Sequence, residues 1–241
     1  MTLARISKWL SQAGLCSRRE AERWIADGRV KVDGAVITSP GTQVEDASRI
    51  LVDDRPLRMP ERPRLWLYHK PRGLLCTNHD PQGRPTIFQA LPFKHHIISV
   101  GRLDLNSEGL LLLTNNGDMA RYCELPKTAW QRYYAVRVHG DLDESALHDL
   151  INGITIDGIH YGKIQVEITR QGSSNTWLYV TLVEGKNREI RVVLGHLGLS
   201  VNRIRRLAYG PFQLGELELG QVSEVPHETF VRHFPFLNKP C

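Results

Sequence analysis

The chain of 241 residues lacks any apolar run close to the roughly 18 residues that a membrane-spanning helix requires. Its first residues have no basic start followed by an apolar block, so they do not predict a secretory leader. The four cysteines are scattered without a CxxC pair, and the ten histidines show no HExxH spacing. These absences argue against a zinc site, a disulfide framework and a membrane partner, and we predict a cytoplasmic protein without a metal.

Acidic residues are scarce in two stretches of a chain whose net charge is only +5. Between residues 186 and 206, Glu189 is the only acidic residue among six basic ones. Residues 1–31 are also predominantly basic. Clusters of this kind are often just solvated faces, but two of them, near opposite ends of the chain, favour a nucleic-acid partner.

The first 52 residues predict a small helical and β-stranded unit. Apolar residues at helical spacing predict a helix over residues 3–13, and Ser17 with Glu20 forms the pattern of a capping box for a second helix that stops at Gly28. The Asp33-Gly34 pair predicts the turn of a hairpin, followed by short strands at Val44 and residues 50–52.

A segment with two prolines, residues 58–63, reads as a linker, so we place a domain boundary between residues 60 and 61. Residues 61–241 then form a larger, mainly β domain, in which the expected strands are 65–69, 74–77, 97–100, 110–113, 132–138, 154–157, 164–168 and 177–183. The expected helices are 86–91, 118–124, 143–151 and a segment ending at Gly198. The pattern beyond Pro226 predicts nothing specific.

Asp104 lies in a short polar loop between two of these apolar strands. A lone loop aspartate usually caps backbone amides. Here Arg102, Asn106 and Glu108 crowd the same loop, which is more polarity than a tight turn requires. A loop held at both ends by a sheet is well suited to fix a functional carboxylate.

The segment GRLDLNSEGLLLLTNNGD, residues 101–118, resembles the catalytic-aspartate motif of the pseudouridine synthases that modify ribosomal RNA. KPRG at residues 70–73 and EGKNREIR at residues 184–191 are similar to two further motifs of that family, and NRIRRLAYGPFQL, residues 202–214, continues the match. The resemblance implies that Asp104 is the catalytic residue and that Arg191 pairs with it.

Tyr133 and Tyr134 are neighbours in an expected strand, so only one of them can face a given cleft. The family pattern of a tyrosine followed by a short apolar strand matches Tyr134, which the resemblance places in the site. The commoner fate of either tyrosine is packing in a sheet.

Residues 3–52 resemble an S4-type RNA-binding domain, most clearly in SRREAERWIADGRVKVDG, residues 17–34. The resemblance implies phosphate contacts that supply affinity rather than sequence reading. The expected contact residues are Arg5, Lys8, Ser17, Arg18, Arg19 and Arg23. We therefore predict an α+β protein: a small α/β S4-type domain followed by a mainly antiparallel, mixed-sheet synthase domain.

Isomerising uridine to pseudouridine requires a carboxylate beside the sugar, and an ionised Asp104 would attack the sugar carbon or remove a sugar proton. Arg191 would keep Asp104 ionised, and Tyr134 would stack on the detached base. Arg102 would fill the gap left by a flipped nucleotide, or else pair with Glu108. The chemistry needs no cofactor.

The motifs look closest to the branch that acts on large-subunit (23S) ribosomal RNA, as free RNA or within an assembly intermediate. Small-subunit ribosomal RNA is the main rival substrate, and transfer RNA is a weaker one. A non-catalytic RNA-binding ribosome assembly factor is the alternative from another class, and a nucleosidase is a third. We expect a monomer.

Overall fold

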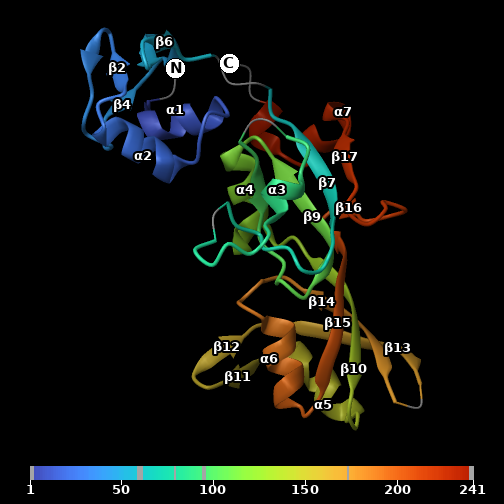
Figure 1. Ribbon diagram of the computed structural model, residues 1–241. Helices are drawn as coiled ribbons and strands as arrows, with labels where there is room; N and C mark the ends of the chain where they lie inside the picture. Colours follow the sequence, from blue (N-terminus) through green and yellow to red (C-terminus); the bar gives the residue numbers. More distant parts are fainter. Residues whose placement is uncertain (1–2, 59–61, 79, 94–95, 173, 239–241) are drawn as a thin grey trace.

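The computed structural model describes residues 3–58, 62–78, 80–93, 96–172 and 174–238. Within them, no helix is long and apolar enough to cross a membrane. Residues 3–58 form a small body beside a much larger one built on a nine-stranded sheet (Figure 1). Residues 59–61 of the expected linker lie outside the described residues, and the boundary at residue 60 stays a prediction.

Two helices and short strands make up the small body. Ser17 begins α2 by accepting a hydrogen bond from the Glu20 backbone, and Asp33 and Gly34 adopt the positive φ values of a tight hairpin turn. Ile6, Leu10 and Ile25 are fully buried in its core. The elements are β1 (Ala4–Arg5), α1 (Ile6–Gln12), α2 (Arg18–Ala26), β2 (Val30–Val32), β3 (Ala35–Val36), β4 (Gln43–Val44), β5 (Ile50–Val52) and β6 (Arg55–Pro56).

The large sheet has the strand order β13-β14-β10-β15-β9-β7-β17, with β8 pairing β9 and β16 pairing β15. Its strands are β7 (Leu65–Lys70), β8 (Ile98–Val100), β9 (Glu108–Thr114), β10 (Arg132–His139), β13 (Ile164–Gln171), β14 (Thr176–Leu182), β15 (Ser200–Tyr209), β16 (Phe212–Gln213) and β17 (Val222–Val225). The pairings are antiparallel except β9 with β15. The predicted fold class, α+β with a mainly antiparallel mixed sheet, is confirmed.

The junction between β9 and β15 divides this sheet into two halves. It consists of two residue pairs, Arg205 with Glu108 and Arg206 with Gly109. We call β7, β8, β9 and β17 the carboxylate half, because Asp104 lies in the loop between β8 and β9. We call β10, β13, β14, β15 and the helix α6 (Glu189–His196) the arginine half.

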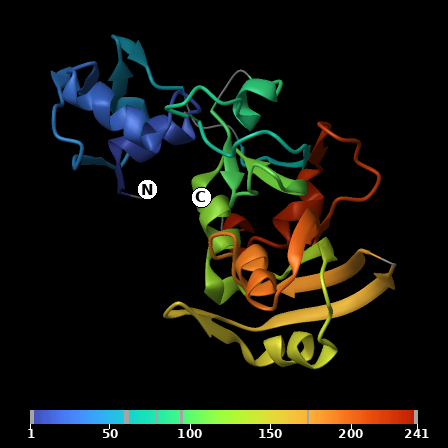
Figure 2. The ribbon, with the colours of Figure 1, turned by 60° about the horizontal axis from the view of Figure 1, so that its bottom comes forward.

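Strand β9 is buried along its whole length, which explains its unbroken run of leucines. Leu111 and Leu113 pack into one apolar core, with α6 and the strands of the arginine half. Leu110 and Leu112 pack into a second core. The remaining elements are α3 (Ile87–Ala90), α4 (Gly117–Glu124), α5 (Glu144–Asp149), β11 (Ile154–Ile156), β12 (Ile159–Tyr161) and α7 (His227–Val231). Figure 2 shows the sheet and its helices from a second direction.

Several expected elements differ from those observed. Residues 74–77 are not a strand: Leu75 forms a single bridge to Thr86, because its backbone bonds to Pro85 and Ile87 in a loop. The first helix begins at Ile6 rather than residue 3, since Ala4 and Arg5 pair with β4. The sequence patterns also did not predict five elements, which are β12, β15, β16, β17 and α7.

The small and large bodies touch at α1 and at the turn that follows it. Lys8 Nζ forms a 2.8 Å ion pair with Asp118 of α4, and the His96 amide donates to the Gly14 carbonyl at 3.1 Å. Both side chains of the ion pair are partly exposed, so this contact is worth little energy by itself.

Candidate active site

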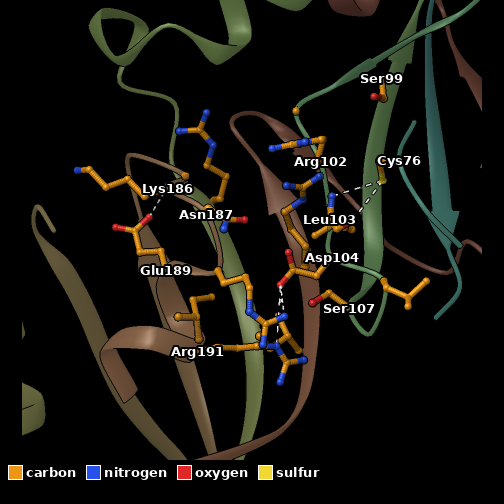
Figure 3. A pocket seen from close by; sticks show the side chains of 18 of the residues that line it. Cys76, Ser99, Arg102, Leu103, Asp104, Ser107, Lys186, Asn187, Glu189 and Arg191 are labelled. Atoms are coloured by element: carbon orange, nitrogen blue, oxygen red, sulfur yellow. Dashed lines mark hydrogen bonds and ion pairs between the residues drawn. The ribbon is translucent and has the colours of Figure 1, made fainter. Parts of the chain in front are cut away.

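A pocket of about 840 Å³ lies where the two halves of the large sheet meet. Asp104 enters it from the carboxylate half and Arg191 from the arginine half (Figure 3). Tyr134 and Arg188 also line it. Its volume is within the range of about 300–1,000 Å³ that is typical of small-ligand sites.

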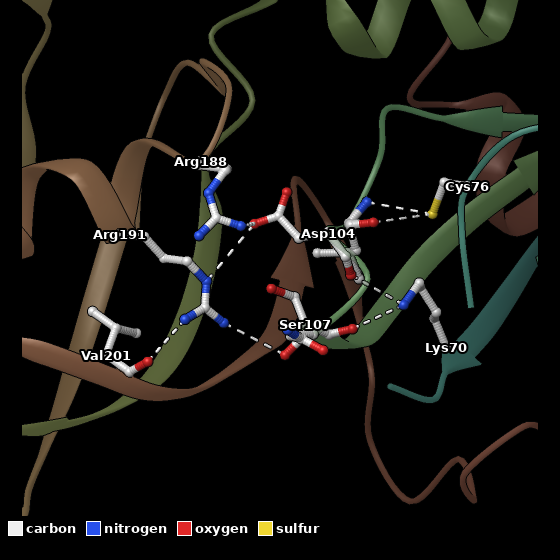
Figure 4. A network of polar contacts seen from close by, with 9 residues as sticks. Lys70, Cys76, Asp104, Ser107, Arg188, Arg191 and Val201 are labelled. Carbon is white, nitrogen blue, oxygen red and sulfur yellow. Dashed lines mark hydrogen bonds and ion pairs between the residues drawn. The ribbon is translucent and has the colours of Figure 1, made fainter. Parts of the chain in front are cut away.

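The backbone of the Asp104 loop is fixed by Lys70, the last residue of β7. The Lys70 side chain is fully buried, and its ammonium donates to the Pro71 carbonyl at 2.9 Å. It also donates to the carbonyls of Asp104 and Ser107 at 3.2 and 2.9 Å (Figure 4). Burial lowers the pKa of Lys70. Three acceptors at a buried cation satisfy all three of its donors, so Lys70 holds the loop in one conformation.

Further backbone bonds hold the same loop on both sides of Asp104. The Gly73 amide donates to the Leu105 carbonyl at 2.7 Å, and Gly101 donates to a Glu124 carboxylate oxygen at 2.6 Å. Cys76 Sγ accepts from the Leu103 amide at 3.4 Å and donates to its carbonyl at 3.3 Å. The KPRG motif at residues 70–73 and the region around Cys76 therefore both serve to position Asp104.

Two arginines face the Asp104 carboxylate. Arg191 Nε and Arg188 Nη1 each lie 3.9 Å from Asp104 Oδ2. At this separation each arginine forms an ion pair with Asp104 but not a hydrogen bond. The carboxylate therefore interacts electrostatically with both charges, and neither arginine occupies its oxygens. Among the described residues, Arg191 Nε is buried without a hydrogen-bond partner.

The Arg191 guanidinium is positioned by its other nitrogens. Nη1 donates to the Val201 carbonyl at 2.8 Å, and Nη2 lies 3.5 Å from the Asn106 carbonyl. Burial, and then the neighbouring Arg188 cation, lower the pKa of Arg191. Arg188 is more exposed and has a left-handed backbone, φ 54°, immediately before α6. Arg188 was not among the predicted site residues, although it lies inside the quoted EGKNREIR motif.

Strand alternation separates the two tyrosines of β10. Tyr134 is 7% exposed and lines the pocket, whereas Tyr133 points to the opposite face and packs against Tyr179. Two buried arginines, Arg132 and Arg206, also line the pocket. Arg206 Nε donates to the Leu110 carbonyl at 2.7 Å, and its Nη2 is buried without a partner in the described part of the chain. Sequence reasoning missed both arginines, because buried arginines in strands have no local pattern.

Glu189, at the first turn of α6, forms part of the pocket wall. Its Oε2 accepts from the Lys186 amide at 3.0 Å, and Glu184 lies beside it, paired with the Lys186 ammonium. Burial, together with the nearby Glu184 carboxylate, raises the pKa of Glu189 to about 7. The segment that delivers Arg188 and Arg191 is thus anchored by an acidic pair.

The predicted RNA-contact residues of the small body differ in their surroundings. Arg5, Arg18, Arg19 and Arg23 are exposed, whereas Lys8 is paired with Asp118 and Ser17 caps α2. Arg102 is exposed at the pocket, and Glu108, its alternative partner, instead accepts a 2.7 Å hydrogen bond from Arg203. In the described residues, no group of three or more His, Cys, Asp or Glu is placed to hold a metal ion.

Comparisons with known proteins agree with both parts of the chain. A family model described as RNA pseudouridylate synthase matches residues 64–196, and an S4 domain model matches residues 4–50. An uncharacterized RNA pseudouridine synthase of Rickettsia bellii is 46% identical over 95% of this chain and 99% of its own.

Two further relatives have more specific names. The ribosomal large subunit pseudouridine synthase B of Salmonella typhimurium is 38% identical over 93% of this chain and 85% of its own. The protein of the same name from Pseudomonas aeruginosa is 40% identical over 92% of this chain and 59% of its own. A crystal structure of a pseudouridylate synthase, 25% identical, covers 95% of this chain and 99% of its own with a TM-score of 0.67.

Proposed function

We propose a substrate and a catalytic carboxylate for this chain, which belongs to the RNA pseudouridylate synthase family and is an RNA pseudouridine synthase with an S4 domain. The substrate we propose is one uridine of large-subunit ribosomal RNA. Two relatives named for the large ribosomal subunit, each matched over more than nine tenths of this chain, support this choice. The exposed arginines of the S4 domain supply charge for the phosphates of a large RNA.

We assign catalysis to Asp104. The observation that carries this assignment is a carboxylate at the pocket, fixed through its backbone and facing two arginines at 3.9 Å. Arg188 and Arg191 place two positive charges beside this carboxylate. The carboxylate attacks the sugar carbon or removes a sugar proton, and either route requires the ionised form.

The reaction is an isomerisation. The bond between the sugar carbon C1′ and the base nitrogen N1 breaks, the base turns, and C1′ bonds to base carbon C5. C5 then loses a proton and N1 gains one, so atoms and electrons balance without a cofactor. Tyr134, at the pocket wall, stacks on the free base while it turns, and Arg102 fills the space left by the flipped nucleotide.

The test is to map pseudouridines in ribosomal and transfer RNA from cells without this protein and from cells restored with the native chain or with Asp104→Asn. We expect one large-subunit site to vanish and to return only with the native chain. Loss of a small-subunit or transfer-RNA site would overturn the substrate assignment. No changed site in any of these RNAs would favour an assembly factor. Full activity of Asp104→Asn would overturn the catalytic assignment.

We further propose that the enzyme acts as a cytoplasmic monomer, on free RNA or on an assembly intermediate.

A further inference from the structure

The strands of the arginine half have a second face that the pocket does not use. Alternation along β10 places Tyr134, Val136 and Val138 in the core, where none is more than 7% exposed. Their neighbours point the other way and are only half-buried. We call this second surface the open face; its residues are Tyr133, Ala135, Arg137, Trp177, Tyr179, Arg203 and Arg205.

The open face contains a hollow flanked by aromatic rings. Ala135 lies directly between Tyr179 of β14 and Arg205 of β15, so a small side chain separates two large ones. The rings of Tyr133 and Tyr179 are 6.0 Å apart at an interplanar angle of 31°. Both tyrosines and Arg205 line a hollow of about 660 Å³ that continues to the turn between β15 and β16.

Arg205 lines the hollow and Arg137 lies beside it on the same face. The acidic Glu167 of β13, by contrast, pairs with Tyr179 in the sheet. The Nε atoms of Arg137 and Arg205 are buried and have no hydrogen-bond partner among the described residues. Arg203, beside Arg137, is already neutralised by Glu108 at 2.6 Å. A buried donor without an acceptor costs free energy, so an anion that reached Arg137 and Arg205 would bind favourably.

We propose that the open face is a second RNA-binding surface, where a single-stranded segment of the substrate RNA stacks a base on Tyr133 or Tyr179 and places its phosphates on Arg137 and Arg205. Flat sheet faces with aromatic rings and arginines bind single strands in this way, because every base has a π-face. The surface is separate from the pocket, which lies on the other side of β10. The proposal rests on RNA as the substrate and not on which RNA is modified.

The test measures binding of the full chain to a fluorescent oligoadenylate of about 12 nucleotides, a length in the range of single-strand sites. This probe contains no uridine, so it is not turned over. We expect Tyr133→Leu with Tyr179→Leu to weaken binding about tenfold or more, since stacking is lost. The matched variant Tyr133→Phe with Tyr179→Phe keeps both rings and should bind within about twofold of the native chain. Native affinity in the leucine variant would overturn the proposal.

Salt dependence tests the arginines independently. Replacing Arg137 and Arg205 by glutamine should reduce the slope of log affinity against log salt by about 1.4, because each lost phosphate contact to a single strand contributes about 0.7. The control replaces Arg121 and Arg232, which lie elsewhere in the large body, by glutamine and should leave the slope unchanged. Equal slopes in both double variants would contradict the proposed phosphate contacts.

Ultraviolet cross-linking of the same probe identifies the bound surface. We expect cross-linked peptides that contain Tyr133 or Tyr179; cross-links confined to the S4 domain would overturn the proposal. If sedimentation instead shows a dimer that the leucine variant dissociates, the open face binds a second copy of this chain, not RNA. None of these results depends on the large-subunit assignment, which pseudouridine mapping tests separately.

Discussion

The loop that carries Asp104 is fixed through its backbone, whereas Arg191 opposite it is fixed through its side chain and its helix. On the carboxylate half, Lys70 binds three carbonyls of the loop and its surroundings, and no hydrogen bond holds the Asp104 carboxylate itself within the described residues. On the arginine half, Arg191 is held by the Val201 carbonyl through its guanidinium. The difference leaves the carboxylate oxygens free for a substrate while the surrounding charges stay in place.

The largest expected effect comes from removing the charge on the carboxylate half. Asp104→Asn keeps the shape of the side chain and should lower the single-turnover rate of pseudouridine formation by about 10³-fold or more. The melting temperature should hardly change, because the Asp104 side chain is partly exposed and anchors no backbone group. Asp141→Asn, at an exposed position, is the control and should be fully active. A stable fold with native activity would remove Asp104 from the mechanism.

Gly109 tests the junction between the two halves. It has φ +107°, and a Cβ placed there would lie 2.3 Å from the carbonyl oxygen and 2.5 Å from the nitrogen of Arg206. Because both atoms are backbone, Gly109→Ala should reduce the free energy of unfolding by about 3 kcal/mol or more. Gly220→Ala, at φ +82° with open space around it, should cost only about 1 kcal/mol. Urea unfolding measures the free energy of unfolding of both variants. Equal losses of stability would mean that β9 and β15 can move apart at the junction without further cost.

Lys70 tests whether the backbone anchor matters to the chemistry. Lys70→Met fills the buried site without donating to the three carbonyls, so the Asp104 loop loses its fixed conformation. We expect kcat to fall about 10- to 100-fold with a smaller change in KM, since positioning rather than binding is lost. The control is Lys163→Met, an exposed position outside the pocket. A rise in KM alone would show that Lys70 acts on RNA binding instead.

The smallest effect is a pH dependence on the arginine half. The pKa of Glu189 is raised by burial to about 7 from an ordinary value of 4.5, so the folded chain holds this proton more tightly than the unfolded chain. Its stabilising contribution is full below pH 4.5, falls as the pH rises towards 7 and is then absent. Glu189→Gln cannot ionise and should be more stable than the native chain at pH 8, by about 2 kcal/mol, but not at pH 4.

Unfolding measured at both pH values tests this prediction. Glu216→Gln, at an exposed position, should follow the native chain throughout. If the free energy of unfolding of Glu189→Gln changed with pH as much as that of the native chain, another group would be the one that titrates.

Local signals in the sequence predicted much of this arrangement. The Asp104 loop between two strands, the opposite directions of Tyr133 and Tyr134, and the cap at Ser17 all follow from short-range patterns. Lys70 was predicted only as part of the KPRG motif and not as an anchor, because its burial depends on a loop 34 residues away. Arg132, Arg206 and the parallel pairing of β9 with β15 were missed for the same reason: each depends on partners distant in the chain.

The C-terminal segment shows the same limit. Phe230 and Phe234 close the second core against β9, yet a helix of five residues gives too few turns for a periodic pattern. The prediction of a strand at residues 74–77 was wrong, although the apolar pattern was present. These apolar residues pack against the core from a loop rather than from within the sheet.

The two-pair junction has a consequence for protein synthesis. The Asp104 loop and its Lys70 anchor are both complete once residue 107 has left the ribosome. The arginines that face Asp104 are made more than eighty residues later, and β15, which docks them onto β9, ends at Tyr209. A nascent chain therefore carries the Asp104 carboxylate long before Arg188 and Arg191 are made and before β15 can place them beside it.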